Sequence, residues 1–355
     1  MSAFAPVNLT DLAGVIHLHS QYSFDGRAKM AEIIAAANGC GCDFLMLTDH
    51  STLQARQEGW EGWHNGTLLM VGEEIAPRFN HYLAFGLPEA IGAVDRSPQE
   101  CIDRVREGGG IGFIAHPDHE GTALFHVKPY PWTAWSVAGY TGLGIWDFMT
   151  DWQKGLTGYL TAIASYVCPA LFLRGPSAVT LARWDELTQK RPVVGIGELD
   201  NHDTPMPVAG LTFSVFSFAR VLRLIRTHLL VDPLTGNAEK DKALLFDALK
   251  RGRAYVALDY FRSAKGFSVI LTEGERSATM GDEFHLRREA MLQVVLPHRA
   301  RIRVIRNGAF FRQGEGKTLS AAIDKPGVYR VEGACKVFGR YRPWIFSNPV
   351  YVVRD

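Results

Sequence analysis

Short apolar runs that alternate with helical patterns constrain the fold of this chain more than any other feature. Between residue 14 and about residue 200 these runs are apolar on both faces, which is typical of parallel sheets covered by helices. Helical patterns at Lys29–Asn38 and Ser97–Glu107 separate them, and the second opens with a capping box at Ser97. Repeated strand–helix units predict an α/β barrel or a doubly wound sheet. The expected strands are Gly14–His19, Asp43–Thr48, Thr67–Gly72, His81–Gly86, Gly110–Ala115 and Val193–Gly197.

After about residue 265 the pattern changes to short strands separated by frequent turns. Arg301–Arg306 alternates polar and apolar residues, and Asn307-Gly308 supplies a hairpin turn before Ala309–Arg312. This pattern predicts a small antiparallel β-sandwich. We therefore expect a first domain over residues 1–265, completed by a helical region at Phe213–Leu249, and a C-terminal domain over residues 266–355. Further expected strands of the second domain are Gly266–Thr272, Met291–Leu296, Val328–Glu332 and Val350–Val353.

The composition is that of an ordinary globular protein. Hydrophobic residues make up 47% of the 355 residues and charged residues 21%, so a sizeable core is expected. The formal net charge of +1 gives no electrostatic signature of nucleic acid or of an anionic membrane. We therefore expect neither a nucleic acid nor a membrane as partner. The five scattered cysteines suit a reducing compartment, and they are Cys40, Cys42, Cys101, Cys168 and Cys335.

One segment imitates a membrane span, because no charged residue occurs from Leu156 to Leu173. It contains Gly158, Ser165 and Pro169, and polar sequence flanks it, so we interpret it as a buried or cleft-lining helical stretch. The first residues, up to Asp11, lack the basic start and apolar run of a signal peptide. The expected location is the cytoplasm.

Histidines and carboxylates occur at almost every strand end. His17 and His19 end the first strand, where residues two apart point to the same face. In a parallel barrel the carboxyl ends of the strands meet on one face, where active sites are found. A single His-x-His pair is weak evidence, but core packing does not place ionisable groups at these ends repeatedly. The other members of the set are Asp25 in a turn-like segment, His50 after the second strand, Glu73 and Glu74 after the third, His81 at the start of the fourth, His116 after the fifth, and Asp200 and His202 after the sixth.

This constellation resembles the PHP (polymerase and histidinol phosphatase) family over roughly residues 14 to 203. The matching motifs are His-x-His with Ser-x-Asp-Gly, Thr-Asp-His, Gly-x-Glu-Ile, Ala-His-Pro and Asp-x-His. The resemblance implies a distorted (β/α)7 barrel that holds two or three divalent metal ions (zinc, manganese or iron). Glu74 is chosen over Glu73 because the family glutamate precedes an aliphatic residue, as Glu74 precedes Ile75, and it is the implied bridging carboxylate. The implied ligands are His17, His19, Asp25, His50, Glu74, His81, His116, Asp200 and His202.

Two motifs depart from the family pattern. Asp25 stands where some members have histidine, and this harder carboxylate ligand favours manganese or iron over zinc at that position. The fourth motif is commonly Gly-Ser-Asp-Ala-His but reads Glu198-Leu199-Asp200-Asn201-His202 here. It keeps both ligand types, while the larger Glu198 and Leu199 alter the neighbouring pocket. The C-terminal stretch Arg342–Tyr351 looks like the appended β-domain of the PHP-like metallohydrolases that include carbaryl hydrolases.

Divalent ions held close together bind a water molecule, lower its pKa and orient it for in-line attack. The leading hypothesis is therefore a metal-dependent phosphoesterase that hydrolyses a small phosphate mono- or diester. A second hypothesis is a hydrolase of carboxyl or carbamate esters or of amides, to which the C-terminal part and a tryptophan-rich insertion point. A third is a non-catalytic metal-binding or assembly module, as PHP domains attached to some polymerases can be. The tryptophans of the insertion are Trp132, Trp135, Trp146 and Trp152.

Four further residues are candidates for contacts with the substrate or the leaving group. His119 and His126 follow the fifth strand and are candidates to protonate a leaving group. Arg78 and Arg174 are candidates to bind a phosphate. The alternative for the histidines is an ordinary core or surface role, and for the arginines a solvent-exposed salt bridge. The sequence leaves the substrate, the native metal and the oligomeric state open.

Overall fold

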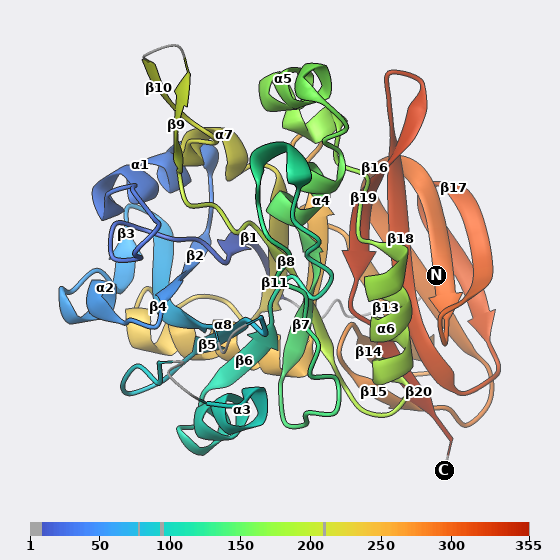
Figure 1. Cartoon of the computed structure of the whole chain (residues 1–355). Helices are drawn as coiled ribbons and strands as arrows, with labels where there is room; N and C mark the ends of the chain where they lie inside the picture. Colours follow the sequence, from blue (N-terminus) through green and yellow to red (C-terminus); the bar gives the residue numbers. More distant parts are fainter. Residues whose placement is uncertain (1–8, 77–78, 93–95, 209–210, 355) are drawn as a thin grey trace.

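The computed structural model describes residues 9–76, 79–92, 96–208 and 211–354. It has an α/β fold with a large sheet, to which the C-terminal β-rich part is joined (Figure 1). Strand β12 (Ala254–Leu258) of the first part pairs antiparallel with β19 (Arg340–Ser347) of the C-terminal part. The expected domain limit at residues 265 and 266 falls between β12 and the next strand, β13 (Ser268–Glu273), and it stays a prediction.

The strands that end near the candidate ligands do not all run in parallel. The pairs β1–β2, β2–β4, β6–β7 and β7–β8 are parallel, whereas β5 is antiparallel to both β4 and β6. The reversed β5 therefore begins at the edge where its neighbours end, so the expectation of parallel strands is wrong at this position. The strands are β1 (Thr10–Ile16), β2 (Phe44–His50), β4 (Thr67–Ile75), β5 (Tyr82–Phe85), β6 (Ile111–Ile114), β7 (Gly142–Asp147) and β8 (Val194–Glu198), and the short β3 (Gly62–His64) pairs with β4.

The segment after β8 returns to the segment after β1. The backbone N–H of Leu199 donates to Ile16 O (3.0 Å), that of Asp200 to His17 O (2.8 Å), and that of His19 to Asn201 O (3.1 Å). Within the described part of the chain this contact is an isolated bridge, Leu18 with Asn201, and not a continuous ladder. The α/β class is thus confirmed, while the distorted seven-stranded barrel stays a prediction.

Helices cover the outside of these strands, and their ends follow local sequence signals (Figure 1). Helix α3 (Pro98–Glu107) begins at the expected capping box, where the Ser97 hydroxyl accepts from the backbone N–H of Glu100 (3.3 Å). Helix α1 (Met30–Cys40) ends at Gly41, whose φ of 64° favours glycine. The other helices are α2 (Gln54–Gln57), α4 (Phe148–Lys154), α5 (Tyr159–Val167), α6 (Ala178–Thr188), α7 (Phe218–Val221) and α8 (Ala238–Arg251), with 3-10 turns at Ala123–Phe125 and Pro169–Leu171.

The region from Phe213 to Leu249, expected to be helical, is only partly so. It contains the central strand β11 (Ile225–Val231), which is antiparallel to both β1 and β12. All seven residues of β11 are buried although Arg226, Thr227 and His228 are polar, so neither alternation nor a continuous apolar run marks it as a strand. The remainder of the region holds α7, α8 and the end of a hairpin formed by β9 (Pro205–Val208) and β10 (Leu211–Ser214).

The C-terminal part is rich in strands, as expected, but two expected strands are one. Met291–Leu296 and Arg301–Arg306 both belong to β16 (Ala290–Arg306), with a register shift between Val295 and Ala300. A bulge of this kind bends a strand without ending it. The other strands here are β14 (Arg276–Thr279), β15 (Glu283–His285), β17 (Ala309–Ile323), β18 (Gly327–Val337) and β20 (Val350–Val353), and β15 pairs with β20 in parallel.

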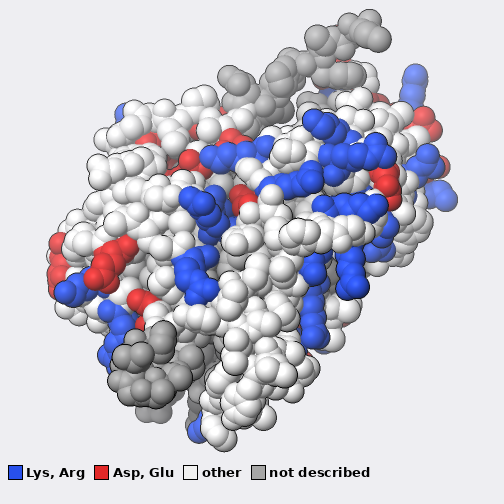
Figure 2. All heavy atoms as spheres, turned by 90° about the horizontal axis from the view of Figure 1, so that it is seen from above, with Lys and Arg blue, Asp and Glu red and all other residues white. Residues whose placement is uncertain are grey.

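Surface charge is unevenly distributed on the face shown in Figure 2. Lysine and arginine side chains gather on the side of the C-terminal strands, next to a stretch with few charges. Exposed basic residues of these strands and their turns include Arg299, Lys317, Lys336 and Arg340. A net charge near zero therefore does not mean an even distribution. Among the described helices, none is both long enough and apolar enough to cross a membrane.

Candidate metal centre

The first two histidines follow β1 and do not lie within it. The strand ends at Ile16, and His17 has a φ of 70°, so the alternation of a strand does not orient these side chains as expected. The hydrogen bonds to the segment after β8 hold this stretch instead, and both imidazoles are completely buried. The expectation that both histidines face one site is correct, but its physical reason is a strained turn against a neighbouring segment.

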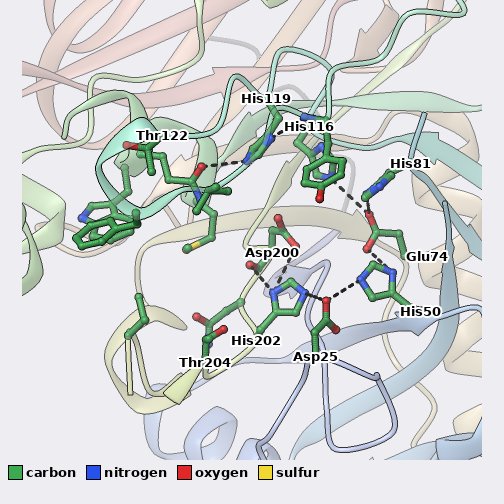
Figure 3. A pocket seen from close by; sticks show the side chains of 18 of the residues that line it. Asp25, His50, Glu74, His81, His116, His119, Thr122, Asp200, His202 and Thr204 are labelled. Atoms are coloured by element: carbon green, nitrogen blue, oxygen red, sulfur yellow. Dashed lines mark hydrogen bonds and ion pairs between the residues drawn. The ribbon is translucent and has the colours of Figure 1, made fainter. Parts of the chain in front are cut away.

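The structure brings all nine implied ligands together in three groups of potential metal-binding atoms. Within each group the atoms lie within 4.8 Å of one another. Glu74 and His19 each belong to two groups, so the three groups form one continuous cluster. Figure 3 labels the members that also line the adjoining cavity, which are Asp25, His50, Glu74, His81, His116, Asp200 and His202. The groups are His19, Asp25, His50 and His202; His17, His19, Glu74 and Asp200; and Glu74, His81 and His116.

Strand register explains why residues from distant parts of the sequence meet here. His50 is opposite Glu74 in the β2–β4 ladder. Tyr82 pairs with Ile75 on one side and with Ile114 on the other. His81 therefore lies beside the ends of both neighbouring strands, and His116 follows the second of them. Because β5 runs antiparallel to β4 and β6, His81, which precedes β5, lies on the same side of the sheet as the residues at the ends of β4 and β6.

Glu74 is the centre of the cluster. Its Oε2 lies 3.2 Å from Nε2 of both His17 and His19, and its Oε1 lies 2.6 Å from Nδ1 of His81. Burial opposes ionisation of this carboxyl group, but the charges of His17 and His81 and the hydrogen bonds of His116 and His17 outweigh it, so the pKa of Glu74 lies well below its ordinary value. A carboxylate held between histidines in this way has the position of a bridging ligand.

The same charged groups shift the pKa values of the histidines in the cluster. Burial alone would lower the pKa of His17, yet the charges of Glu74 and Asp200 raise it well above its ordinary value. The pKa of His116 is raised to about 9, because hydrogen bonding to Glu74 outweighs its burial. Histidines that bind a cation must lose these protons, so a cation bound at this cluster would release protons.

The residues present fit a group of divalent ions. The buried Nε2 atoms of His17 and His19 face the buried Oε2 of Glu74 at 3.2 Å, but none of the three atoms makes a hydrogen bond of good geometry among the described atoms. Buried polar atoms normally have partners, and these point into one shared space. Imidazole nitrogens and carboxylate oxygens are ligands of zinc, manganese and iron alike. The donor set therefore matches a cluster of divalent ions without selecting among them.

Glu198 supports the cluster and was not anticipated in this role. It is completely buried at the end of β8, its Oε1 lies 3.1 Å from Nδ1 of His17, and its Oε2 accepts from the backbone N–H of His116 (2.9 Å). A Cβ atom at Gly144 would lie 1.4 Å from this carboxylate, so glycine is required there. Glu198 thus holds the imidazole of His17 from behind, as carboxylates behind metal-binding histidines do. The signal in the sequence was its departure from the family motif.

Asp49 and Ser23 give further support. The carboxylate of Asp49 accepts from both the backbone N–H (2.6 Å) and the hydroxyl (2.7 Å) of Ser20, which follows His19. Ser23 Oγ lies 3.2 Å from Nδ1 of His19 and accepts from the backbone N–H of His50 (3.0 Å). Asp49 was part of the Thr-Asp-His motif, so the sequence signal was present but had no role attached to it.

Asp147 is a buried acid that sequence reasoning missed. It ends β7, a strand that was not among those expected, and its Oδ1 accepts from the backbone N–H of Thr150 (2.6 Å). Burial and then the charges of Asp200 and Glu198 raise the pKa of Asp147 to about 7. Its other oxygen has no hydrogen-bond partner among the described atoms, so a buried acid of unusual pKa adjoins the cluster.

The candidate substrate contacts separate into different environments. His119 is buried beside the cluster, its Nε2 lies 3.0 Å from Gln153 Oε1, and its Nδ1 accepts from the backbone N–H of Tyr130 (3.1 Å). Burial, and then the charge of His116, lower its pKa to about 4. His126 and Arg174 are exposed and are not among the described residues that line the adjoining cavity. Arg78 lies outside the described residues.

A cavity of about 1210 Å³ opens directly beside the metal-ligand cluster. Asp25, His50 and Glu74 form one end of it, and residues of α5 line the other, as expected for a cleft-lining helix. Of the four tryptophans of the insertion only Trp152 lines this cavity. Trp132 and Trp146 are buried in the hydrophobic core. Trp135 packs against Arg183, whose guanidinium carbon lies 5.0 Å from the centre of the Trp135 ring.

The chain matches known proteins in both sequence and structure. Residues 16–102 match the PHP domain family model. The uncharacterized protein MJ1587 of Methanocaldococcus jannaschii is 26% identical over 113 residues, which cover 29% of this chain and 66% of that protein. The chain therefore spans just under two thirds of the length of that relative.

Two solved structures are also similar. One is a two-domain protein from Bacteroides vulgatus that contains a predicted PHP-like metal-dependent phosphoesterase; the identity is 15%, 96% of each chain is covered and the TM-score is 0.45. The other is a proposed metal-dependent phosphoesterase from Bifidobacterium adolescentis, with 15% identity, 59% of this chain and 94% of the other covered, and a TM-score of 0.37. Six of the nine clustered residues, His17 to His81, lie inside the family-model match. The chain thus matches the PHP domain family model over residues 16–102, a segment that holds these six residues.

Proposed function

We propose that this chain is a metal-dependent phosphoesterase that hydrolyses a small phosphate mono- or diester. The observation that carries the proposal is the sharing of Glu74 and His19 between adjoining groups of ligand atoms. Such sharing supports two or three ions (zinc, manganese or iron) held close together. We include in the proposal the distorted seven-stranded barrel and the division into residues 1–265 and 266–355.

The ions, when bound, lower the pKa of a water molecule and supply positive charge beside the phosphoryl oxygens. The chain itself fixes the ligands from behind, through Glu198 at His17 and Ser23 at His19. His119, neutral near pH 7 and held by Gln153, presents a polar edge to the cavity beside the cluster. We therefore assign it a positioning role toward the substrate, in place of the proton donor that its place in the sequence indicated.

A panel of phosphate mono- and diesters, assayed with added manganese or zinc, tests the proposal. We expect turnover that is lost in His19→Ala and Asp200→Ala, two variants that remove ligands from the same group. Elemental analysis of the same preparations reports whether the metal is bound. Bound metal without turnover of any ester would refute the phosphoesterase and favour a non-catalytic metal-binding module.

The cavity favours a second candidate, a hydrolase of carboxyl or carbamate esters or of amides. Its wall away from the ligands is largely apolar, with Phe125, Trp152 and Ile163 among the lining residues. The same activated water can attack a carbonyl carbon. Comparing nitrophenyl phosphate with nitrophenyl acetate and a nitrophenyl carbamate separates the two, because the leaving group is constant and only the bond that is cleaved differs.

A further inference from the structure

We infer that the apolar end of the cavity is a binding site for a bulky hydrocarbon group of the substrate. The site would accept an amphiphilic ester, with its polar head at the metal-ligand cluster and its hydrocarbon part against α5. This inference rests on the proposed function for the position of the head, but the hydrocarbon site itself is independent of which ester bond is cleaved.

Helix α5 forms one wall of the cavity. The residues Tyr159, Ala162, Ile163 and Tyr166 all line it, and they occupy positions i, i+3, i+4 and i+7, which share one side of a helix. Phe24, which follows the first ligand motif, also lines the cavity, and its ring stacks on His50 at the ligand end. The charged residues among the described lining side chains, Asp25, Glu74 and Asp200, are all at the ligand end. The charged side chains of the cavity, labelled in Figure 3, are thus confined to the ligand end.

Several of these apolar side chains are exposed to solvent. The exposed fraction is 79% for Phe24, 71% for Tyr159 and 63% for Ile163. Single exposed apolar residues need no explanation, but a group of them around one concave site marks a place where an apolar partner binds. Burying this surface under a ligand releases the water that now covers it, which is the usual source of affinity for hydrocarbon groups.

Ring contacts connect the apolar wall to the ligand cluster. The Phe24 ring stacks on that of His50 with centroids 4.9 Å apart, and the Phe125 ring stacks on that of Trp152 at 6.4 Å. A hydrocarbon group packed against Phe24 therefore lies beside His50, a member of the cluster. The volume of about 1210 Å³ exceeds the roughly 300–1,000 Å³ of sites that enclose a drug-sized molecule, so a small phosphate alone would fill little of it.

A series of alkylphosphonates tests the inference, because the phosphonate head is constant and is not hydrolysed as an ester. Binding of ethyl-, butyl- and octylphosphonate to the metal-loaded protein is measured by calorimetry below the micellar concentration. Complete burial of one methylene multiplies the association constant by about four. We expect octylphosphonate to bind at least about tenfold more tightly than ethylphosphonate, with a more negative heat-capacity change.

Two substitutions on α5 form a matched pair. Ile163→Asp places a charge in the cavity wall, whereas Leu160→Asp places the same charge at a position that is 84% exposed and does not line the cavity. We expect Ile163→Asp to abolish the gain with chain length, and Leu160→Asp to keep it. Equal affinity across the series in the unmodified protein, or an equal loss in both variants, would overturn the inference.

The proposed function is measured in parallel, so that the two failures are distinguishable. A chain-length gain without hydrolysis of octyl phosphate or nitrophenyl phosphate supports the hydrocarbon site and refutes the phosphoesterase. Hydrolysis of nitrophenyl phosphate without any gain in affinity with chain length supports the phosphoesterase and refutes the hydrocarbon site.

Discussion

The Oε1 atom of Glu198 lies 3.1 Å from Nδ1 of His17, with both side chains completely buried. This contact leaves Nε2 of His17 directed at Glu74 and Asp200, 3.2 Å from an oxygen of each. The carboxylate therefore selects which nitrogen of His17 faces the cluster. The residue that departs from the common family motif is the one that orients the first ligand.

Replacing Glu198 tests this role. We expect Glu198→Gln to weaken metal binding by about 10- to 100-fold, because the amide is a poorer partner for the imidazole N–H than a carboxylate. The measurement is a competition titration of metal-loaded protein with a chelator. A thermal melt of the variant serves as the control for folding. Unchanged metal affinity in a folded variant would show that Glu198 only fills space behind His17.

Glu73 and Glu74 provide a matched comparison, since adjacent residues of one strand face opposite sides. Glu74 faces the histidines, whereas Glu73 accepts from the backbone N–H groups of Ile91 (2.6 Å) and Gly92 (3.3 Å). We expect Glu74→Gln to lose bound metal, and Glu73→Gln to keep metal but to lower the free energy of unfolding by about 1–3 kcal/mol. Elemental analysis and urea denaturation of both variants check this. Metal loss in Glu73→Gln alone would reverse the assignment.

The nine candidate ligands were named from motifs that resemble a family pattern and that recur beside apolar runs, and the structure brings the nine together. Three features that position the ligands were not predictable. The direction of β5 depends on long-range pairing, which an apolar run such as Tyr82–Phe85 does not encode. The φ of His17 is imposed by the segment after β8. Asp147 ends β7, which is apolar on both faces but contains Gly142 and Gly144 and was not recognised as a strand.

The C-terminal part was predicted as strands separated by turns, and the turn at Asn307-Gly308 does join β16 to β17. The length of β16 was missed because Pro297 and the polar residues after it interrupt its alternation. In the first part, β11 was missed because its polar residues, among them His228, are buried with partners that lie far away in the sequence. The local pattern of apolar and polar residues carries no information about such distant partners.

Arg330 and Asp185 connect the C-terminal part to α6 through a buried bidentate ion pair. Its N–O distances are 2.6 Å and 2.8 Å, and Arg330 is only 4% exposed. We expect Arg330→Met to lower the free energy of unfolding by about 3–5 kcal/mol, because it leaves the charge of Asp185 buried without its partner. The double variant Arg330→Met with Asp185→Leu should recover most of this loss. Denaturant unfolding of the unmodified protein, both single variants (Arg330→Met and Asp185→Leu) and the double variant gives the coupling. A double variant no more stable than Arg330→Met would contradict it.

His228 gives the stability a specific dependence on pH. It is completely buried, with Nδ1 2.9 Å from Asp11 Oδ1 and Nε2 3.1 Å from Asp259 Oδ2. Burial would lower its pKa, but the hydrogen bonds to both carboxylates raise it to about 8 from the ordinary 6.5. Because the folded pKa is the higher one, the stabilisation is complete below about pH 6.5 and is lost as the pH rises through 8; the shift corresponds to about 2 kcal/mol. Urea denaturation at pH 6 and pH 9 measures this difference. The His228→Gln variant should be less stable than the unmodified protein at pH 6, and its free energy of unfolding should differ little between pH 6 and pH 9. If the variant shows the same difference between pH 6 and pH 9 as the unmodified protein, the pH dependence belongs to other groups.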